Sequence, residues 1–244
     1  MKQFTTPMER KRMRALVLLS GGQDSTTGLY WALNKGFECE ALIINYGQRH
    51  KIEIESAMKI AQFADVPYQV FTTNLLKHIG DSALIGDGDI SAKHRNSNLP
   101  ASFVPGRNIL FLAIAGMISY KRGINNIVIG VSQDDNSGYP DCREDTILAM
   151  QAALSLGMDT EFYIQTPFMF FTKKAEVMIA KTLPNCMKAL ALSHTCYEGK
   201  FPPCGKCASC VLRAKGFSEA GISDPLIERA KNEGKLQKSF KTNR

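Results

Sequence analysis

The chain has 244 residues, of which 44% are hydrophobic, and it carries a formal net charge of +7. This size suits one domain with a small appendage, and no apolar run approaches the ~20 residues of a membrane-spanning helix. The positive charge lies at the two ends: residues 1–14 carry +4 and residues 229–244 carry +5, which leaves about −2 for the body. We therefore expect a cytoplasmic protein that binds neither nucleic acid nor membranes.

Short apolar runs alternate with helical patterns along the first part of the chain. Residues 15–20 predict a buried strand, 26–34 a helix, 39–46 a second strand, 51–64 an amphipathic helix and 67–73 a third strand. This order predicts a parallel sheet with right-handed crossovers. We interpret the helix at 51–64 as core packing only.

The second part of the chain continues the alternation after a long loop, which is expected at 74–103. A helix is then expected at 108–121, a strand at 126–131, a polar loop at 134–143, a helix at 144–156, a strand at 162–167 and a helix from Thr172. The fold class is α/β, with a doubly wound parallel sheet and a small C-terminal metal-binding segment. We expect a basic extension at 1–13, an α/β domain at 14–185, a four-cysteine segment at 186–225 and a basic tail at 226–244.

The sequence SGGQDS at residues 20–25 follows the first predicted strand. Two glycines let several backbone N–H groups converge on an anion, and the helix N-terminus behind them adds positive potential. A plain turn capped by Asp24 or Ser25 would show the same residues. The loop lacks the length and the lysine of a Walker A motif. Ligands of such sheets bind beyond the carboxyl ends of the strands, where this loop and two other polar loops converge.

Four of the seven cysteines fall within fifteen residues, namely Cys196, Cys204, Cys207 and Cys210. Thiolates two residues apart fold back onto one metal ion, and a fourth completes the tetrahedron of a structural zinc site. An iron–sulfur cluster is the alternative, and disulfides suit a cytoplasmic protein poorly. His194 is a reserve ligand. The other cysteines, Cys39, Cys142 and Cys186, are interpreted as buried small residues.

The run LSGGQDST resembles the pyrophosphate-binding loop of the PP-loop ATP pyrophosphatases, which cleave ATP between its α and β phosphates. Further runs are similar to the 7-cyano-7-deazaguanine synthase branch of that family: YGQRH at 46–50, FVPGRN at 103–108, GVSQDDNSGYPDCR at 130–143, TK at 172–173 and CGKCASCVLRAKGF at 204–217. The likeness extends over roughly residues 14–225. Asn45 stands where that branch is expected to have Asp.

The resemblance implies an adenine nucleotide alpha hydrolase-like fold and an ATP-dependent carbon–nitrogen ligase of queuosine biosynthesis. It would convert 7-carboxy-7-deazaguanine and ammonia to 7-cyano-7-deazaguanine, use ATP, Mg²⁺ and Zn²⁺, and form a homodimer. The implied catalytic residues are Ser20, Asp24, Ser25 and Lys173. The implied nucleotide-binding residues are Leu19, Ser20, Gly21, Gly22, Gln23, Asp24, Ser25, Thr26, Thr27, Gly28 and Leu29.

The loop at 134–143 contains groups suited to that substrate. One carboxylate of Asp134, Asp135 or Asp141 would accept both the ring N–H and the exocyclic amine of a deazaguanine, and Tyr139 would stack on the ring. Arg107 or Arg143 would pair with the 7-carboxylate, and Asn108 is a further candidate. The plain alternative is a surface loop in which Asp141 caps the next helix.

Three other functions stay open on the sequence. A tRNA-thiolating enzyme would need a basic body or an RNA-binding domain. A non-catalytic nucleotide-binding zinc module would tolerate a degraded phosphate loop, whereas SGGQDS is intact. A ligase that joins a deazaguanine acid to another amine would share the same motifs.

Overall fold

A computed structural model of the chain describes residues 13–79, 82–86, 99–132 and 139–236. Several predictions fall outside these ranges: residues 1–12 of the expected extension at 1–13, much of the expected loop at 74–103, Asp134 and Asp135, and residues 237–244 of the expected tail. Among the helices described, none has the length and apolar character needed to cross a membrane.

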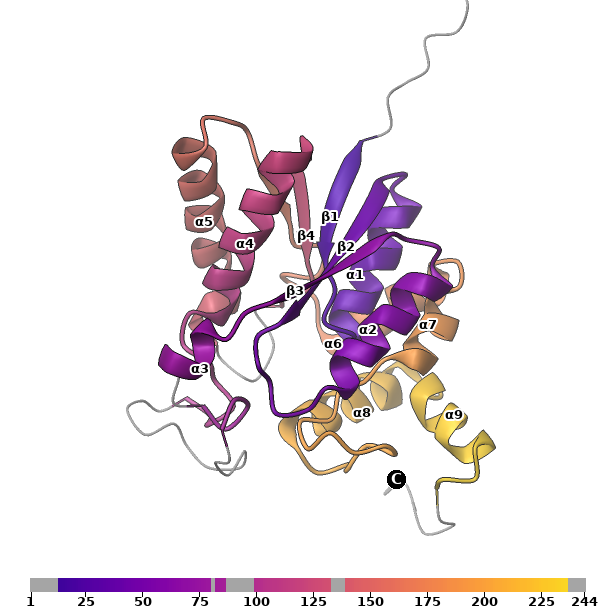
Figure 1. The fold of residues 1–244 in the computed structure, drawn as a ribbon. Coiled ribbons are helices and arrows are strands. Elements are labelled where there is room, and N and C mark those ends of the chain that lie inside the picture. The colour runs from indigo at the N-terminus through magenta and orange to yellow at the C-terminus, as the bar shows by residue number, and fades with distance from the viewer. Residues whose placement is uncertain (1–12, 80–81, 87–98, 133–138, 237–244) are drawn as a thin grey trace, which may run out of the picture.

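The centre of the molecule is a five-stranded parallel sheet, which confirms the predicted fold class (Figure 1). Its strand order is β3-β2-β1-β4-β5. The strands are β1 (Arg14–Leu18), β2 (Glu38–Asn45), β3 (Tyr68–Thr72), β4 (Asn126–Ile129) and β5 (Tyr163–Gln165). The chain builds the sheet outward in one direction from β1 to β3 and in the other from β4 to β5. A crevice therefore opens between the carboxyl ends of β1 and β4, where such sheets bind ligands.

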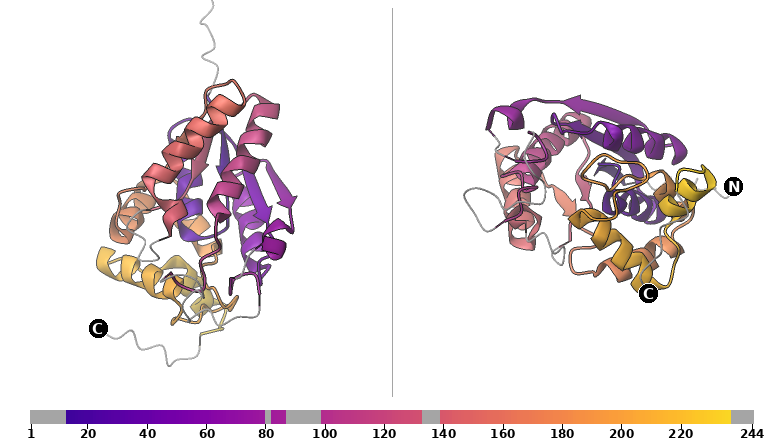
Figure 2. Two further views of the ribbon diagram at one scale, coloured as in Figure 1. Left: turned by 90° about the vertical axis from the view of Figure 1, so that its left-hand side faces the viewer. Right: turned by 90° about the horizontal axis from the view of Figure 1, so that it is seen from below.

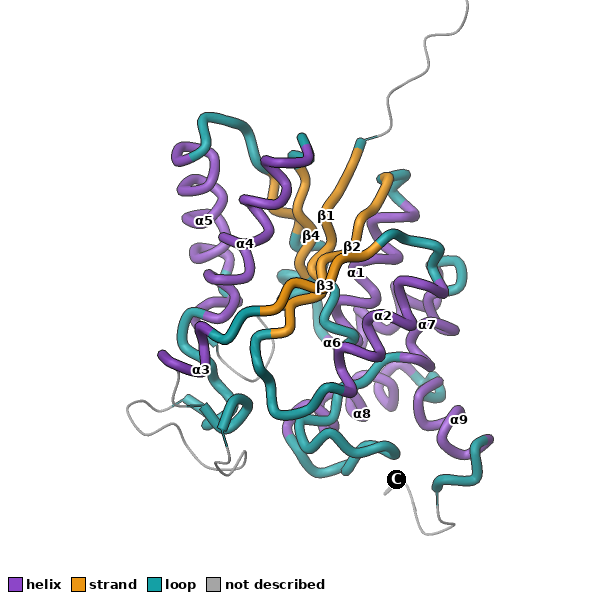
Figure 3. Tube along the Cα trace, viewed as in Figure 1, coloured by secondary structure: helices purple, strands orange, loops and turns teal. Residues whose placement is uncertain are grey.

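Helices cover both faces of the sheet (Figure 2). One face carries α4 (Arg107–Arg122) and α5 (Glu144–Gly157), and the other carries α1 (Gln23–Asn34) and α2 (Ile52–Phe63), backed by α7 (Cys186–Leu192). The remaining helices are α3 (Leu75–Ile79), the short 3₁₀ turn η1 (Pro140–Cys142), α6 (Lys173–Thr182), α8 (Ala208–Ala220) and α9 (Pro225–Asn232). Helices α6 and α8 pack against each other near the carboxyl ends of the strands (Figure 3).

Two apolar layers result from the alternation of side chains along the buried strands. In β1, Leu16 and Leu18 join the layer under α4 and α5, whereas Ala15 and Val17 join the layer under α1 and α2. Because both faces are covered, the central strands β1, β2 and β4 read as largely apolar runs, whereas the edge strand β3 alternates between exposed and partly buried residues. This is why the strand predictions succeed.

Most of the described elements agree with the sequence-based expectation to within two residues, and three larger differences stand out. Helix α1 begins at Gln23 rather than at residue 26, because the hydroxyls of Ser25 and Thr26 bond to the Gly22 carbonyl and let the helix start directly after the glycine pair. The expected loop at 74–103 contains the short helix α3. Part of the expected basic tail forms α9, which packs on α7 and buries Leu226 and Ala230.

A buried arginine holds the C-terminal helices together. Arg213 of α8 is 4% exposed and forms a two-point ion pair with Asp224, at 2.7 Å (Nε–Oδ2) and 2.8 Å (Nη2–Oδ1). Its Nη1 donates to the hydroxyls of Ser193 and Thr195, and Nη2 also donates to the Leu190 carbonyl. Asp224 in turn accepts from the Leu226 N–H as the N-cap of α9. One guanidinium thus joins the end of α7, α8 and the start of α9.

Replacing Asp224 by Asn should lower the free energy of unfolding by about 3 kcal/mol, because it leaves the buried Arg213 charge without its counter-charge. Asn remains a good N-cap, so the loss reports on the ion pair rather than on the cap of α9. The control is Glu219→Gln, which breaks the exposed Lys215–Glu219 pair on the same helix and should cost less than about 0.5 kcal/mol. Urea unfolding measures both variants, and equal losses would contradict the role assigned to Arg213.

Candidate functional site

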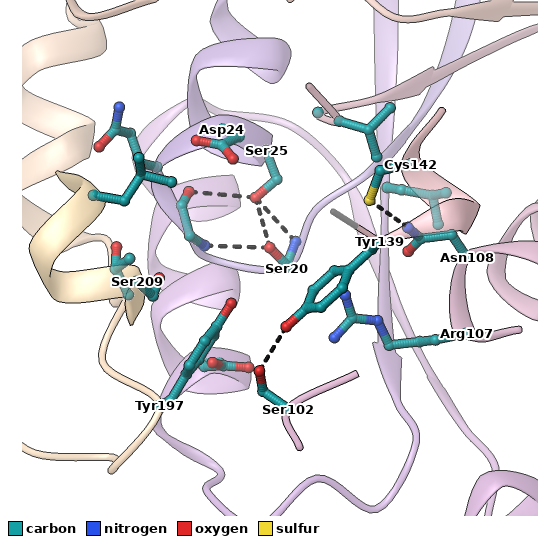
Figure 4. A pocket seen from close by; sticks show the side chains of 18 of the residues that line it. Ser20, Asp24, Ser25, Ser102, Arg107, Asn108, Tyr139, Cys142, Tyr197 and Ser209 are labelled. Carbon is teal, nitrogen blue, oxygen red and sulfur yellow. Dashed lines mark hydrogen bonds between the residues drawn. The ribbon is translucent and has the colours of Figure 1, made fainter. Parts of the chain in front are cut away.

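A cavity of about 530 Å³ occupies the crevice at the carboxyl ends of β1 and β4 (Figure 4). The loop after β1 and the first turn of α1 form one wall, and the start of α4 forms another. The side chains of α8 and of the segment before it close a third side, so the C-terminal part of the chain completes the cavity. The predicted convergence of loops at this edge of the sheet is therefore present in the described residues.

The loop after β1 has its polar groups arranged around the start of α1. Ser20 Oγ and Ser25 Oγ lie 2.9 Å apart, and the N–H groups of Ser20 and Gly22 donate to these hydroxyls. The N-cap residue of α1 is Gly22, which has no side chain to cap the helix. The N–H groups of the first turn, at Gln23, Asp24 and Ser25, have no acceptor within the helix, and their residues line the cavity. This geometry suits an anion.

Two glycines fix this loop against its neighbours. A Cβ at Gly21 would lie 2.4 Å from the Glu53 carbonyl oxygen in α2, and Gly21 has a positive φ of 84°. A Cβ at Gly130, after β4, would lie 2.6 Å from the Asp24 carbonyl. The His194 N–H donates to the Gly21 carbonyl at 2.8 Å. Backbone contacts with three other segments therefore set the position of the loop.

A lysine from α6 lies on the carboxylate of the loop. Lys173 Nζ is 2.7 Å from Asp24 Oδ2 and 3.1 Å from Glu176 Oε2. Glu176 is 1% exposed, and burial together with the Asp24 carboxylate raises its pKa well above the ordinary value, although Lys173 opposes the rise. The ammonium of Lys173 also lines the cavity. Ser20, Asp24, Ser25 and Lys173, the four predicted catalytic residues, thus lie together.

The predicted nucleotide-binding residues divide into two groups. Ser20, Gly22, Gln23, Asp24 and Ser25 line the cavity. The others do not line it, and most are buried in the core or within α1: Leu19, Gly21, Thr26, Thr27, Gly28 and Leu29. Thr26 and Thr27 donate their hydroxyls to helix carbonyls, which holds the first turns of α1.

The opposite end of the cavity is aromatic and carries a cation (Figure 4). Arg107, the first residue of α4, lies among Tyr46, Tyr139 and Tyr197. Burial would lower the pKa of Arg107, but the phenol groups and the Asp141 carboxylate raise it, so the guanidinium stays charged. Burial raises the pKa of all three tyrosines. Their hydroxyls therefore serve as hydrogen-bonding groups.

The predicted substrate-binding residues are only partly brought together. Arg107, Asn108 and Tyr139 line the cavity, and Tyr139 Oη lies 2.6 Å from Ser102 Oγ. Asp141 does not line it, since its Oδ2 accepts the Asn108 N–H at 2.9 Å and so caps α4 instead of the helix that follows it. Arg143 is exposed, outside the cavity lining, at the N-cap of α5.

Sequence reasoning missed most of the other cavity residues, among them Tyr46, Ser102, Tyr197 and Glu53. Glu53 belongs to α2, which we expected only to pack in the core. The sequence nevertheless gave a signal for Glu53. It stands four residues before Ala57 and seven before Ile60, so it shares the buried face of that helix. Burial raises the pKa of Glu53 to about 7, although the Arg107 charge limits the rise.

The four predicted metal ligands form a compact cluster. The sulfur atoms of Cys196, Cys204, Cys207 and Cys210 all lie within 4.8 Å of one another. Backbone N–H groups point at two of them, from Cys204 to Cys196 Sγ at 3.4 Å and from Cys207 to Cys204 Sγ at 3.3 Å. Such donors favour thiolates, so this donor set fits a tetrahedral metal ion. The reserve ligand His194 lies outside the cluster, and its Nε2 is 3.0 Å from the Cys196 carbonyl oxygen.

Comparison with known proteins identifies the family. The family model described as "Queuosine biosynthesis protein QueC" matches residues 14–221. A 7-cyano-7-deazaguanine synthase of Laribacter hongkongensis is 50% identical over 218 residues, which cover 88% of this chain and 94% of that protein. The enzyme of the same name from Chromobacterium violaceum is 49% identical over 225 residues, which cover 90% and 95%. One from Lysinibacillus sphaericus is 40% identical over 210 residues, which cover 86% and 96%. The chain belongs to the family of the queuosine biosynthesis protein QueC.

Proposed function

We propose that this protein is an ATP-dependent carbon–nitrogen ligase that makes 7-cyano-7-deazaguanine from 7-carboxy-7-deazaguanine and ammonia. One observation carries the proposal beyond family membership. The open first turn of α1, the Lys173 ammonium and the Arg107–tyrosine end all border one cavity of about 530 Å³. A nucleotide and a planar acid can therefore meet in a single site.

In the first step, the substrate carboxylate attacks the α-phosphorus of ATP, and pyrophosphate leaves. The N–H groups of Gln23, Asp24 and Ser25 and the Lys173 ammonium would hold the departing pyrophosphate. Asp24 is the carboxylate at this loop that would ligate Mg²⁺ on the phosphates. The substrate is then an acyl-adenylate, whose leaving group is AMP instead of oxide.

Ammonia next attacks the acyl carbon, releases AMP and leaves the primary amide. A second ATP adenylates the amide oxygen, again with loss of pyrophosphate. Elimination of AMP and a proton gives the nitrile. Acid, amide and nitrile share one oxidation level, so the sequence requires no electron transfer. The work of the protein is to position the reactants and to stabilise charge on the phosphates.

We further propose that Zn²⁺ is held by Cys196, Cys204, Cys207 and Cys210. When bound, it would supply folding free energy to the C-terminal segment rather than chemistry. Cys196 lies between Thr195 and Tyr197, which line the cavity, and Cys207 directly precedes α8, whose side chains also line it. A zinc ion bound by these four cysteines would hold in place the cavity wall that α8 and the segment before it form.

The nucleotide products test the reaction. Incubation with ATP, Mg²⁺, ammonium and 7-carboxy-7-deazaguanine should yield AMP, pyrophosphate and the nitrile, as measured by chromatography and mass spectrometry. The 7-amide supplied in place of the acid should also be converted to nitrile when ATP is present. Formation of ADP and phosphate alone, or an amide that never reacts, would refute the mechanism.

Lys173→Ala should reduce AMP formation about 10²-fold or more, because it removes the cation beside the phosphate loop. The matched control is Lys174→Ala, one residue along the chain on an exposed position, which should stay within roughly twofold of the wild type. Circular dichroism checks that both variants are folded. Equal turnover in the two variants would remove Lys173 from the site.

Elemental analysis of the purified protein should find about one zinc ion per chain. Cys207→Ala should lose this metal and become sensitive to proteolysis between residues 196 and 220, because the ligands no longer close the segment. Cys39→Ala, which changes a buried cysteine of the sheet, should retain the metal. Iron with matching sulfide, or metal retained in Cys207→Ala, would contradict the zinc assignment.

A further inference from the structure

The second residue of α2 has a fixed position relative to the phosphate loop. The Glu53 carbonyl oxygen would lie 2.4 Å from a Cβ at Gly21, so the two backbones are in close contact. This contact leaves no room for a side chain at Gly21. The Glu53 side chain lines the cavity from this anchored position.

The carboxylate of Glu53 differs from the other carboxylates near the site because it has no hydrogen-bond or ion-pair partner among the described residues. Within the described parts of the chain, no hydrogen bond or ion pair involves its side-chain oxygens. Asp24 and Glu176 are both paired with Lys173, and Asp141 caps α4. A half-buried carboxylate without a partner is costly unless a ligand completes it.

The surroundings of Glu53 suit a flat, polar ring. Arg107 lies close enough to Glu53 to affect the pKa of its carboxyl group. In the described part of the chain, however, Arg107 and Glu53 do not form an ion pair with each other. Tyr46, Tyr139 and Tyr197 supply aromatic surface around the same space. A heterocycle placed there could meet a carboxylate, a guanidinium and stacking surfaces together.

We propose that Glu53 reads the guanine-type edge of the substrate, accepting the ring N–H and the adjacent exocyclic amine with its two carboxylate oxygens. This inference rests on the proposed function for the identity of the ring. It replaces Asp141, which is committed to α4, as the carboxylate that distinguishes a deazaguanine from a ring without the amine. Glu53 is thus a specificity-determining residue.

The test measures binding by calorimetry without ATP, for two ligands: 7-carboxy-7-deazaguanine and the analogue that lacks the exocyclic amine. The wild type should bind the first about 10- to 100-fold more tightly, the range of a charge-assisted hydrogen bond. Glu53→Gln should bind the two ligands with nearly equal, weak affinity. Glu55→Gln, a change of the same type at an exposed position of α2, should discriminate as the wild type does.

The outcomes separate this inference from the proposed reaction. Equal affinities in the wild type, full discrimination in Glu53→Gln, or a wild type that binds neither ligand would overturn the role of Glu53. Discrimination that depends on Glu53, in a protein that does not turn over the acid with ATP and ammonium, would refute only the reaction. Steady-state kinetics add a second readout: Glu53→Gln should raise the KM for the acid and leave the KM for ATP unchanged.

Discussion

Close backbone contact around the loop between β1 and α1 is the constraint on which the site depends. The loop touches α2 at Gly21 and the end of β4 at Gly130, with no room for a side chain at either glycine. A hydrogen bond from His194 adds the segment that leads into the cysteine cluster. The N–H groups of α1 must converge on one point to hold an anion. These contacts therefore determine how precisely the N–H groups are positioned.

The charges of the site follow from this scaffold. Lys173 is drawn between two carboxylates at one end of the cavity, and Arg107 lies among tyrosines at the other. A cation at each end suits a reaction that brings together the phosphates of a nucleotide and the carboxylate of an acid. Two acidic residues belong to the described cavity lining. Asp24 is paired with Lys173, whereas for Glu53 a donor edge of the ligand offers the simplest role.

The sequence was most informative where structure depends on local pattern. Buried parallel strands read as apolar runs, the glycine pair marks the turn into α1, and the cysteine spacing is contained within fifteen residues. Contacts between segments far apart in the chain could not be predicted from the sequence. Asp141 caps a helix that begins more than thirty residues earlier, and a local view assigned it to a ligand or to the following helix. Glu53 gave a visible signal, a carboxylate on an apolar helix face, but core packing was the simpler interpretation.

The position of α8 in the chain has a consequence for biosynthesis. The sheet is complete once β5 has been made, at residue 165, whereas α8 at residues 208–220 supplies one wall of the cavity. A chain emerging from the ribosome can therefore assemble the cavity walls formed by the sheet, α1 and α4 before the wall formed by α8 exists. During that interval the crevice is open to solvent on the side that α8 later closes. Chains that end before residue 208 would contain every strand of the described sheet but would lack the α8 wall of the cavity.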